Sequence, residues 1–364
     1  MTVPFDAASP GDRALGLYSA VGDALAGRRL GFGLRRAALA ARFARHRGAD
    51  DSGTTASWVA GLLAEIGHVA VVLPTGAAPR AQLLLLADAP LYGARIVAGL
   101  PGLPAHASDV VRWHREHDDG TGFPDRLRWD GIPADAASLG IANAFMEAIE
   151  DPEEPRDAAE ALFAILSENG RRFRVELVRT FREFIVLTPA WDAPCDPVLP
   201  LFDEDALLAG LAEMLDARAA HTLGRTARVV ELARSLAARL DLDEGRIVRA
   251  ARLLALGATG LEVAQDRLDP LSRFARDRRA AAARHAAAVA ETVAAYRDDA
   301  PVLAASGGWH EDGPRDPLAG ALALAFAVDA IGPSDAPRLV AAAAGTQFDP
   351  DAVRVYLSRT GAPT

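Results

Sequence analysis

Apolar residues recur at every third or fourth position along most of the chain. Residues 226–240 (TARVVELARSLAARL) place leucines four residues apart, and residues 34–44 (LRRAALAARFA) have the same spacing. This period puts the apolar side chains on one face of a helix. The two stretches most similar to β-strands, residues 68–74 (HVAVVLP) and 82–87 (QLLLLA), are short enough to be buried helical segments. The pattern predicts an all-α protein.

A proline-rich stretch interrupts the helical pattern at residues 188–205. Four prolines fall within it: Pro189, Pro194, Pro197 and Pro200. Prolines at this density break helices and favour an extended connector. We therefore predict one domain over residues 1–187, a linker over 188–205 and a second domain over 206–364.

The two predicted domains contain similar segments in the same order. Residues 113–124 (WHREHDDGTGFP) resemble residues 309–317 (WHEDGPRDP), and residues 169–181 (NGRRFRVELVRTF) resemble residues 344–357 (AGTQFDPDAVRVYL). Such matches indicate an internal duplication. The sequence predicts two tandem helical bundles.

Composition and charge limit the classes of partner. The 364 residues carry a formal net charge of −10, which argues against a nucleic-acid-binding surface. The single cysteine, Cys195, is typical of a reducing compartment. The N-terminus lacks a signal pattern, and the longest apolar run, residues 319–328, is too short to span a bilayer. We expect a cytoplasmic protein with neither nucleic acid nor a membrane as partner.

One short segment concentrates the candidate chemistry. Residues 114–124 read HREHDDGTGFP, in which charged and imidazole side chains precede a turn built on two glycines and a proline. Such a segment can form the rim of a metal site, but its spacing alone favours a solvated turn after a helix. Glu65, which follows a run of core leucines, is open to two interpretations as well, a carboxylate ligand or a surface charge.

This segment and its surroundings resemble the HD-GYP family of HD-domain phosphohydrolases. The family signature includes Leu-Leu-His-Asp-Ile-Gly-Lys and His-His-Glu-x-x-Asp-Gly-x-Gly-Tyr-Pro, and His114 and Glu116 occupy the first His and the Glu of the second motif. The turn residues of that motif are matched by Asp119, Gly120, Thr121, Gly122, Phe123 and Pro124. The resemblance implies a helical fold and a divalent metal centre that activates water to hydrolyse cyclic di-GMP.

Most metal-ligand positions of the family carry other residues here. In the first repeat these replacements are Phe32 at the helix-entry His, Ala64 and Glu65 at His-Asp, His68 at the Lys, Ala89 at the His-Pro His, Arg115 at the second His and Ala144 at the closing Asp. In the second repeat Arg225 and Phe326 replace an entry His and a metal Asp, while His285 and His310 match isolated ligand positions. The resemblance therefore leaves four remnant metal positions: His114, Glu65, His285 and His310.

These departures favour a catalytically inactive, tandem HD-GYP-like signalling protein that acts by protein–protein interaction. We expect no catalytic residue and no cofactor, and a divalent metal (Fe, Mn or Zn) only if residual activity is retained. The predicted partner or ligand loop comprises Arg115, Glu116, Asp119, Gly120, Thr121, Gly122, Phe123, Pro124 and Arg126. Its expected partners are signalling proteins, among them a cyclic di-GMP synthase domain, together with a cyclic dinucleotide and a second copy of the chain.

Two alternatives remain open at this point. The first repeat would be a cyclic di-GMP receptor without hydrolysis if Arg115, Arg126 and Arg128 contact phosphates in place of metals. It would be a residual metal-dependent phosphodiesterase if His114, Glu116 and Glu65, with Glu147 or His68, hold a metal.

Overall fold

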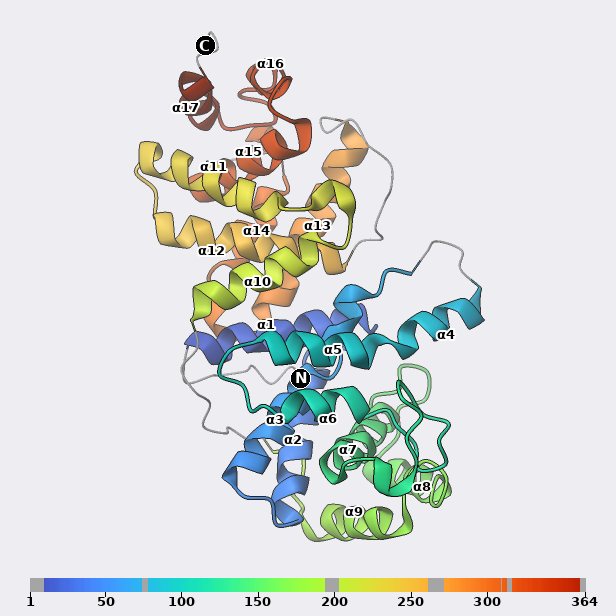
Figure 1. Ribbon diagram of the computed structural model, residues 1–364. Coiled ribbons are helices and arrows are strands. Elements are labelled where there is room, and N and C mark those ends of the chain that lie inside the picture. The colour runs from blue at the N-terminus through green and yellow to red at the C-terminus, as the bar shows by residue number, and fades with distance from the viewer. Residues whose placement is uncertain are drawn as a thin grey trace. The chain divides into compact units, whose positions relative to one another are not determined.

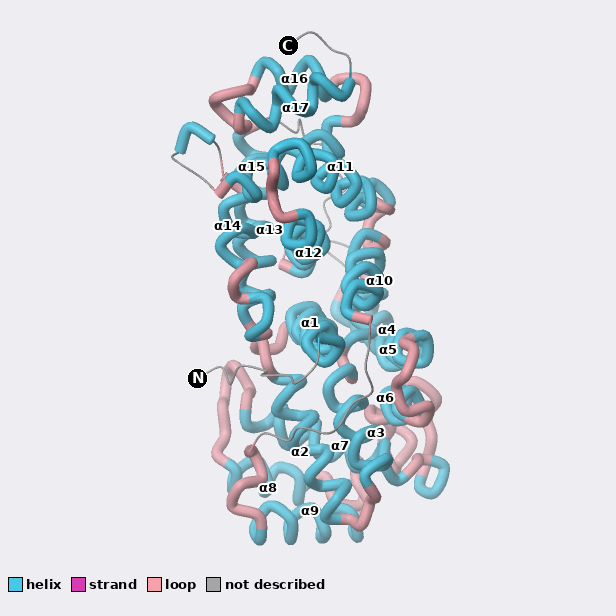
Figure 2. The backbone as a smooth tube through the Cα atoms, turned by 90° about the vertical axis from the view of Figure 1, so that its left-hand side faces the viewer, coloured by secondary structure: helices cyan, strands magenta, loops and turns pink. Residues whose placement is uncertain are grey.

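A computed structural model describes residues 10–73, 78–193, 203–260, 272–308, 310–312 and 316–360. The chain folds into two compact units, unit 1 (Met1–Phe202) and unit 2 (Asp203–Thr364). Figures 1 and 2 show helices joined by loops in both units, and the described residues form no β-strand. The prediction of an all-α protein is confirmed.

The described residues of unit 1 form α-helices and short 3-10 helices (η). Its elements are α1 (Pro10–Leu25), α2 (Phe32–His46), α3 (Asp51–Leu63), η1 (Ile66–Ala70), α4 (Pro79–Ala87), α5 (Ala89–Gly99), α6 (Ala107–Trp113), η2 (Trp129–Gly131), α7 (Ala134–Ile149), α8 (Ala158–Ser167) and α9 (Val175–Leu187). Helix α2 packs against α3 and α7, and α5 packs against α6. Residues 82–87 lie within α4, as expected, whereas only residues 68–70 of the other strand-like stretch are helical, in η1. The expectation that both are buried is wrong, because Leu83 and Leu84 are 67% and 64% exposed.

Three phenylalanine rings from different helices pack together in the core of unit 1. Phe43 of α2 lies 5.0 Å from Phe181 of α9 between ring centroids, and Phe145 of α7 lies 5.4 Å from Phe181. These three rings are fully buried, and edge-to-face pairs of this kind add to the stabilisation from apolar burial. The cluster holds α2 and α7 together, and both helices contribute side chains to the site described below.

Unit 2 repeats much of this order. Its elements are α10 (Glu204–Asp216), η3 (Ala220–Thr222), α11 (Arg225–Leu240), α12 (Glu244–Leu254), η4 (Ala255–Thr259), α13 (Arg273–Glu291), η5 (Ala294–Tyr296), α14 (Ala300–Ser306), η6 (His310–Asp312), α15 (Pro317–Ile331), α16 (Ala336–Ala342) and α17 (Pro350–Thr360). Helix α11 packs against α12 and α15, as α2 packs against α3 and α7.

In both units an aspartate carboxylate binds the backbone at the start of a helix. In unit 1 the carboxylate of Asp23 accepts hydrogen bonds from the backbone of Gly31 and Gly33, at 3.0 Å each, where α2 begins. In unit 2 Asp216 accepts from the backbone of Thr226 at 2.6 Å, where α11 begins. A left-handed glycine precedes each helix, with φ of 88° at Gly31 and 68° at Gly224.

Both units also contain a pair of backbone hydrogen bonds that join two distant segments. In unit 1 Asp118 and Asp119 donate backbone hydrogen bonds to the carbonyls of Arg172 and Arg171, at 3.2 and 2.9 Å. In unit 2 His310 and Glu311 donate in the same way to Gln347 and Thr346, at 3.2 and 2.9 Å. These repeated contacts support the predicted duplication, which remains a prediction of the sequence.

The predicted linker lies largely outside the described residues. Helix α9 ends at Leu187 and α10 begins at Glu204, while residues 194–202, with Cys195 and three of the four prolines, are not described. The structure divides the chain between Phe202 and Asp203. The predicted boundaries, a linker over residues 188–205 between two domains, stay a prediction.

One segment, Arg80–Gly99, is long and apolar enough to cross a membrane by length and composition. It is divided between α4 and α5, which meet at Asp88, and α5 packs against α6 and η1 within unit 1. Core helices of soluble proteins have the same composition, so the expected absence of a membrane partner stays a prediction.

Candidate functional site

Glu116 organises the loop that follows α6. Its carboxylate accepts hydrogen bonds from the backbone of Asp125 at 2.6 Å and of Leu127 at 2.9 Å, and the side chain is 4% exposed. A carboxylate that binds two backbone N–H groups fixes the path of the chain around it. Glu116 is therefore a loop-forming residue in this structure.

The glycine-containing turn packs directly on the backbone before it. A Cβ atom at Gly122 would lie 2.3 Å from the nitrogen of His117, so this position requires glycine. Asp119 accepts hydrogen bonds from the backbone and hydroxyl of Thr121 at 2.9 and 2.6 Å, and the Phe123–Pro124 peptide bond is cis. The DGTGFP match to the family motif is thus a folded turn held by local contacts.

The outer side of this loop presents an aromatic and several arginine side chains. Trp129 is 59% exposed, and its backbone has a φ of 44°, a conformation uncommon for a residue other than glycine. Arg174 donates to the Trp129 carbonyl at 2.7 Å and lies 3.5 Å from the carboxylate of Asp118. Arg126, with a φ of 55°, and Arg128 are exposed.

The predicted ligand His114 is buried at the end of α6. Its Nδ1 lies 2.7 Å from the carbonyl of Val111, and its Nε2 has no hydrogen-bond partner among the described residues. Burial, and then the charge of Arg115, lowers the pKa of His114 to about 3. The imidazole is therefore neutral at physiological pH.

Glu65 lies at the centre of the candidate site, and the interpretation of this residue as a surface charge is wrong. Its side chain is 2% exposed and forms ion pairs with Arg36 of α2 at 3.1 Å and with Arg115 at 2.6 Å. His68 Nδ1 lies 3.2 Å from the other carboxylate oxygen. The Asp position of the family motif thus holds a carboxylate between two guanidinium groups.

Further contacts extend these ion pairs into a network. Arg36 is fully buried and donates to the carbonyl of Gly61 at 2.7 Å and to the side chain of Asn143 at 2.9 Å. Glu147 of α7 pairs with Arg28, with Arg115 at 3.4 Å and with Arg172 at 4.0 Å. We call this network the charge cluster; its members are Arg28, Arg36, Glu65, Arg115, Glu147 and Arg172.

The electrostatics of the charge cluster favour ionised carboxylates at its centre. Burial by itself would raise the pKa of Glu65, but Arg115 and Arg36 hold it well below its ordinary value. Asp23 behaves differently, because burial raises its pKa to about 6 despite the nearby charge of Arg36. The guanidinium groups therefore stabilise negative charge on Glu65 directly.

The residues present do not fit a divalent metal centre. Within the described ranges, no three or more His, Cys, Asp or Glu side chains are grouped so that they could hold a metal ion. His114 offers one neutral nitrogen, whereas the neighbouring carboxylate of Glu65 is bound by two cations. A metal at this place would meet the positive charges of Arg36 and Arg115.

The remnant positions of unit 2 make separate contacts. His285, on α13, lies 2.8 Å from the hydroxyl of Thr259 through its Nε2, and burial lowers its pKa. His310 Nδ1 lies 3.8 Å from the carboxylate of Asp349. The structure therefore brings Glu65, His114 and Arg115 together in unit 1, and places His285 and His310 in other settings in unit 2.

The sequence reasoning missed Arg36, Arg28, Asn143 and Arg172. One signal for Arg36 is present in the sequence, because it lies on the same helical face as Phe32, Leu39 and Phe43, which are buried. A charged residue on an apolar face needs a buried partner. The spacing within α2 does not indicate which residue that partner is.

Comparisons with known proteins agree with this geometry. The family model described as the HD domain matches residues 23–177, a range that contains the whole charge cluster.

Residues 23–177 match the HD domain.

The predicted HD-domain resemblance is therefore confirmed for this region, while a tandem, degenerate HD-GYP pair remains a prediction.

One solved structure has the same fold over nearly the whole chain. It is a cyclic GMP-AMP specific phosphodiesterase of V. cholerae (V-cGAP3), 15% identical, with a TM-score of 0.69. The alignment covers 97% of this chain and 98% of that chain. A search of curated proteins found no match.

Proposed function

We propose that this chain is a catalytically inactive, HD-GYP-like protein that acts by binding in a cyclic-dinucleotide-related signalling process. The observation that carries the proposal is the position of Glu65 between Arg36 and Arg115. The resemblance assigns metal ligands to the positions of Glu65 and Arg115, and the Glu65 carboxylate is paired with two guanidinium groups. The similarity to a cyclic GMP-AMP phosphodiesterase supports the link to cyclic dinucleotides.

The loop after α6 is the surface we assign to a protein partner. Trp129 is exposed on a backbone that Arg174 and Glu116 hold in place through hydrogen bonds. Tryptophan and arginine side chains contribute a large share of the binding energy in many protein interfaces. An exposed tryptophan on a preorganised loop favours a protein partner. The resemblance to the HD-GYP family is the reason for proposing a signalling protein, such as a cyclic di-GMP synthase domain.

The two alternatives, a cyclic di-GMP receptor and a residual metal-dependent phosphodiesterase, have less support in unit 1. Arg115 pairs with Glu65 and Glu147, so phosphate binding there would have to compete with two carboxylates. A residual phosphodiesterase would need Glu65 and His114 as ligands, and the first is bound by two cations while the second offers one nitrogen. The phosphodiesterase and the Arg115 contact of the receptor therefore require that the charge cluster opens, whereas Arg126 and Arg128 are exposed.

Metal analysis and a hydrolysis assay test the proposal together. Protein purified without chelators should contain less than one equivalent of Fe, Mn or Zn. It should leave cyclic GMP-AMP and cyclic di-GMP intact when each of these metals is added. Stoichiometric metal together with metal-dependent hydrolysis would overturn the proposal.

The binding role needs a second measurement. A pull-down with the full chain should recover a synthase-domain protein, and Trp129→Ala should reduce its recovery about tenfold. Leu166→Ala, which removes a partly exposed leucine of α8, is the control and should leave recovery unchanged. Equal recovery with wild type and Trp129→Ala would contradict the assignment of this loop.

A further inference from the structure

Helix α4 of unit 1 exposes apolar side chains on most of its surface. Residues 80–88 read RAQLLLLAD, and the side chains of Leu83, Leu84 and Leu85 are 67%, 64% and 40% exposed. Successive residues of a helix point about 100° apart, so four consecutive leucines cover most of its circumference. A helix that is apolar on all sides is normally buried, yet the principal neighbour of α4 among the described residues is α5. Much of α4 therefore lacks a covering surface.

The two charged residues of this segment lie at opposite ends of the leucine run. Arg80 is the second residue of α4 and Asp88 is its C-cap, and both are exposed. Leu84 lies midway between them, so the three positions, four residues apart, follow one side of the helix. Neither charge forms an ion pair among the described residues, and the Asp88 side chain accepts no capping hydrogen bond from α5. The segment thus carries one unpaired charge of each sign.

These charges are placed against the dipole of α4 itself. The N-terminal end of a helix carries a partial positive charge and its C-terminal end a partial negative charge, so an isolated helix favours acidic residues first and basic residues last. Helix α4 has no acidic residue in its first turn and no basic residue in its last. A second helix in the antiparallel direction would compensate both ends, because its dipole and its charges run in the opposite sense.

The segment is complementary to an antiparallel copy of itself. When two α4 helices cross at Leu84, Arg80 of each copy lies opposite Asp88 of the other, and leucines face leucines between these two ion pairs. A two-fold axis forms such contacts twice from a single surface. Opposite charges beside an apolar seam also set the direction and register of paired helices.

We propose that two copies of this chain associate through α4, packed antiparallel about Leu84. The self-complementary charges favour a second copy over an unrelated protein. A bilayer fits less well, because the chain has a formal charge of −10 and Arg80 is the only basic residue of α4. This surface goes beyond the proposed function, which rests on the charge cluster and on the loop after α6.

The size of α4 limits the strength of this dimer. A helix of 9 residues is about 14 Å long, and one pair of such helices buries less than the roughly 1,200 Å² of a standard interface. We therefore expect a weak dimer, with a Kd on the order of 10 µM.

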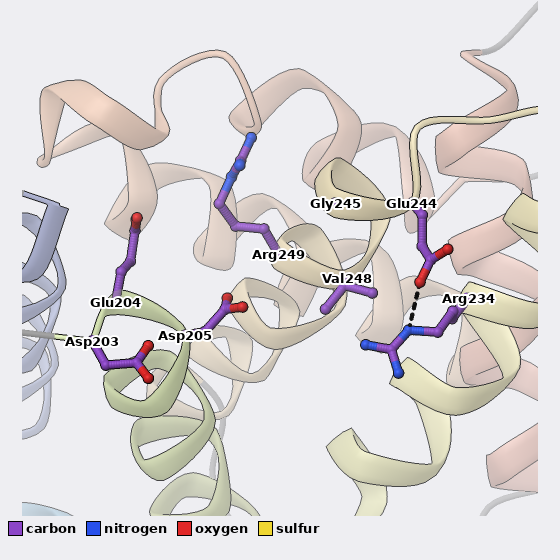
Figure 3. A pocket seen from close by; sticks show the side chains of 8 residues that line it. All are labelled: Asp203, Glu204, Asp205, Arg234, Glu244, Gly245, Val248 and Arg249. Carbon is purple, nitrogen blue, oxygen red and sulfur yellow. Dashed lines mark ion pairs between the residues drawn. The ribbon is translucent and has the colours of Figure 1, made fainter.

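Exposed charges of unit 2 show the usual alternative, in which arginines pair within the chain. A cavity of about 480 Å³ there is lined by four acidic residues and two arginines, drawn as sticks in Figure 3. Arg234 pairs with Glu244 at 2.9 Å, and each side chain is about half exposed. Arg234 therefore supplies a control for the charge changes below.

Sedimentation of the full chain between about 1 and 100 µM tests the proposal. Wild type should dimerise over this range, and Leu84→Lys should weaken dimerisation at least about tenfold, because it opposes like charges at the two-fold axis. Phe163→Lys, at a residue of α8 that is 73% exposed, is the control and should dimerise as wild type does. A wild-type chain that stays monomeric, or an equal Kd for wild type and Leu84→Lys, would overturn the proposal.

Charge reversal tests the antiparallel register. Arg80→Glu and Asp88→Arg each replace two attractive contacts with two repulsive ones, so each should weaken dimerisation about tenfold at low salt. An equimolar mixture of these two variants has opposite charges at both ends of the seam and should regain wild-type association. Arg234→Glu should have no effect. A mixture no more dimeric than either variant alone would overturn the antiparallel pairing.

Two further outcomes would assign α4 to another occupant. Vesicles of phosphatidylcholine and phosphatidylglycerol that bind wild type but not Leu84→Lys, with no dimer in solution, would assign it to a bilayer. A monomeric chain whose Tm falls in Leu84→Lys would show that α4 is covered within one chain. Either result would overturn the proposal. None of these measurements depends on metal, hydrolysis or Trp129, so they are distinct from failure of the proposed function.

Discussion

Arginines of the two units have different carboxylate partners: those of the charge cluster surround the buried Glu65, whereas Arg225 and Arg228 of α11 pair with Asp329 of α15. In unit 1, Glu65 and Glu147 lie among the arginines and neutralise much of their charge within the protein. In unit 2, Ala255 and Leu256 follow α12 where Ala64 and Glu65 follow α3, and they provide no carboxylate. At this position unit 2 therefore has apolar side chains in place of a buried acid.

A single buried carboxylate accounts for much of this difference. Glu65 allows Arg36 to be buried completely, whereas the corresponding position of α11, five residues after the left-handed glycine, is Val229. A buried guanidinium needs a buried partner, while a buried valine needs none. Burial of a charged side chain at this position thus depends on the acidic residue that unit 1 has and unit 2 lacks.

The largest expected effect follows from removing the central carboxylate. Glu65→Gln leaves Arg36 and Arg115 without their shared charge partner and should lower the free energy of unfolding of unit 1 by about 3–5 kcal/mol. Urea titration with hydrogen exchange of peptides from each unit measures the change separately in unit 1 and unit 2.

Two variants serve as controls for this comparison. Glu153→Gln, at an exposed loop position of unit 1, should have an effect within about 0.5 kcal/mol. The double variant Arg36→Met/Glu65→Leu should lose less stability than the sum of its single changes, because neither buried charge remains unpaired. A cost of Glu65→Gln below about 1 kcal/mol would mean that the cluster is solvated and that the contrast with unit 2 is wrong.

The second largest expected effect is a dependence of the stability of unit 1 on pH. The pKa of His114 is lowered to about 3 in the folded state, so below its ordinary value near 6.5 the unfolded chain binds a proton that the folded chain does not. This contribution to stability is present above pH 6.5 and is lost as the pH falls from 6.5 towards 3. Between pH 7 and pH 5 wild type should lose about 2 kcal/mol more than His114→Phe, measured by urea unfolding of unit 1 at both pH values.

The pH comparison must use the difference between the two proteins. The pKa of Asp23 is raised to about 6, so its protonation stabilises the folded state as the pH falls from 6 to its ordinary value and opposes the effect of His114. Both proteins contain Asp23, so its contribution cancels in the difference. Parallel pH profiles for wild type and His114→Phe would show that the imidazole is not buried in its neutral form.

The smallest expected effect lies in unit 2. Asp329→Asn removes the partner of Arg225 and Arg228, but Arg228 is about half exposed and water can solvate it. The variant should lose about 1 kcal/mol of stability in unit 2, and Asp277→Asn, at an exposed site, should lose less than about 0.5 kcal/mol. A stability loss equal to that of Glu65→Gln would remove the distinction between the two sites.

The sequence predicted the helical architecture and the folded turn at residues 119–124 correctly. Helical periodicity in α2 and α11, and the glycines of DGTGFP, are local signals that need no knowledge of distant contacts. The replacement of metal ligands by residues such as Ala64, Ala89 and Ala144 is implied by the family resemblance and stays a prediction.

The composition of the charge cluster depended on contacts between distant residues. Arg36 lies 29 residues from Glu65, Arg115 lies 50 residues from it, and Asn143 lies 107 residues from Arg36. Helical spacing placed Arg36 on an apolar face and left Glu65 open to interpretation as a ligand or a surface charge. Packing of α2 against α3 and α7 decided that both are buried partners.

The sequence by itself determined that this protein is helical and that it contains a glycine-dependent turn. The tertiary structure decided that Glu65 is buried between Arg36 and Arg115 in unit 1, and that Arg225 and Arg228 pair with Asp329 in unit 2. The physical reason is that local periodicity follows from the backbone, whereas the ionisation and pairing of a buried charge depend on which distant side chains share its low-dielectric surroundings.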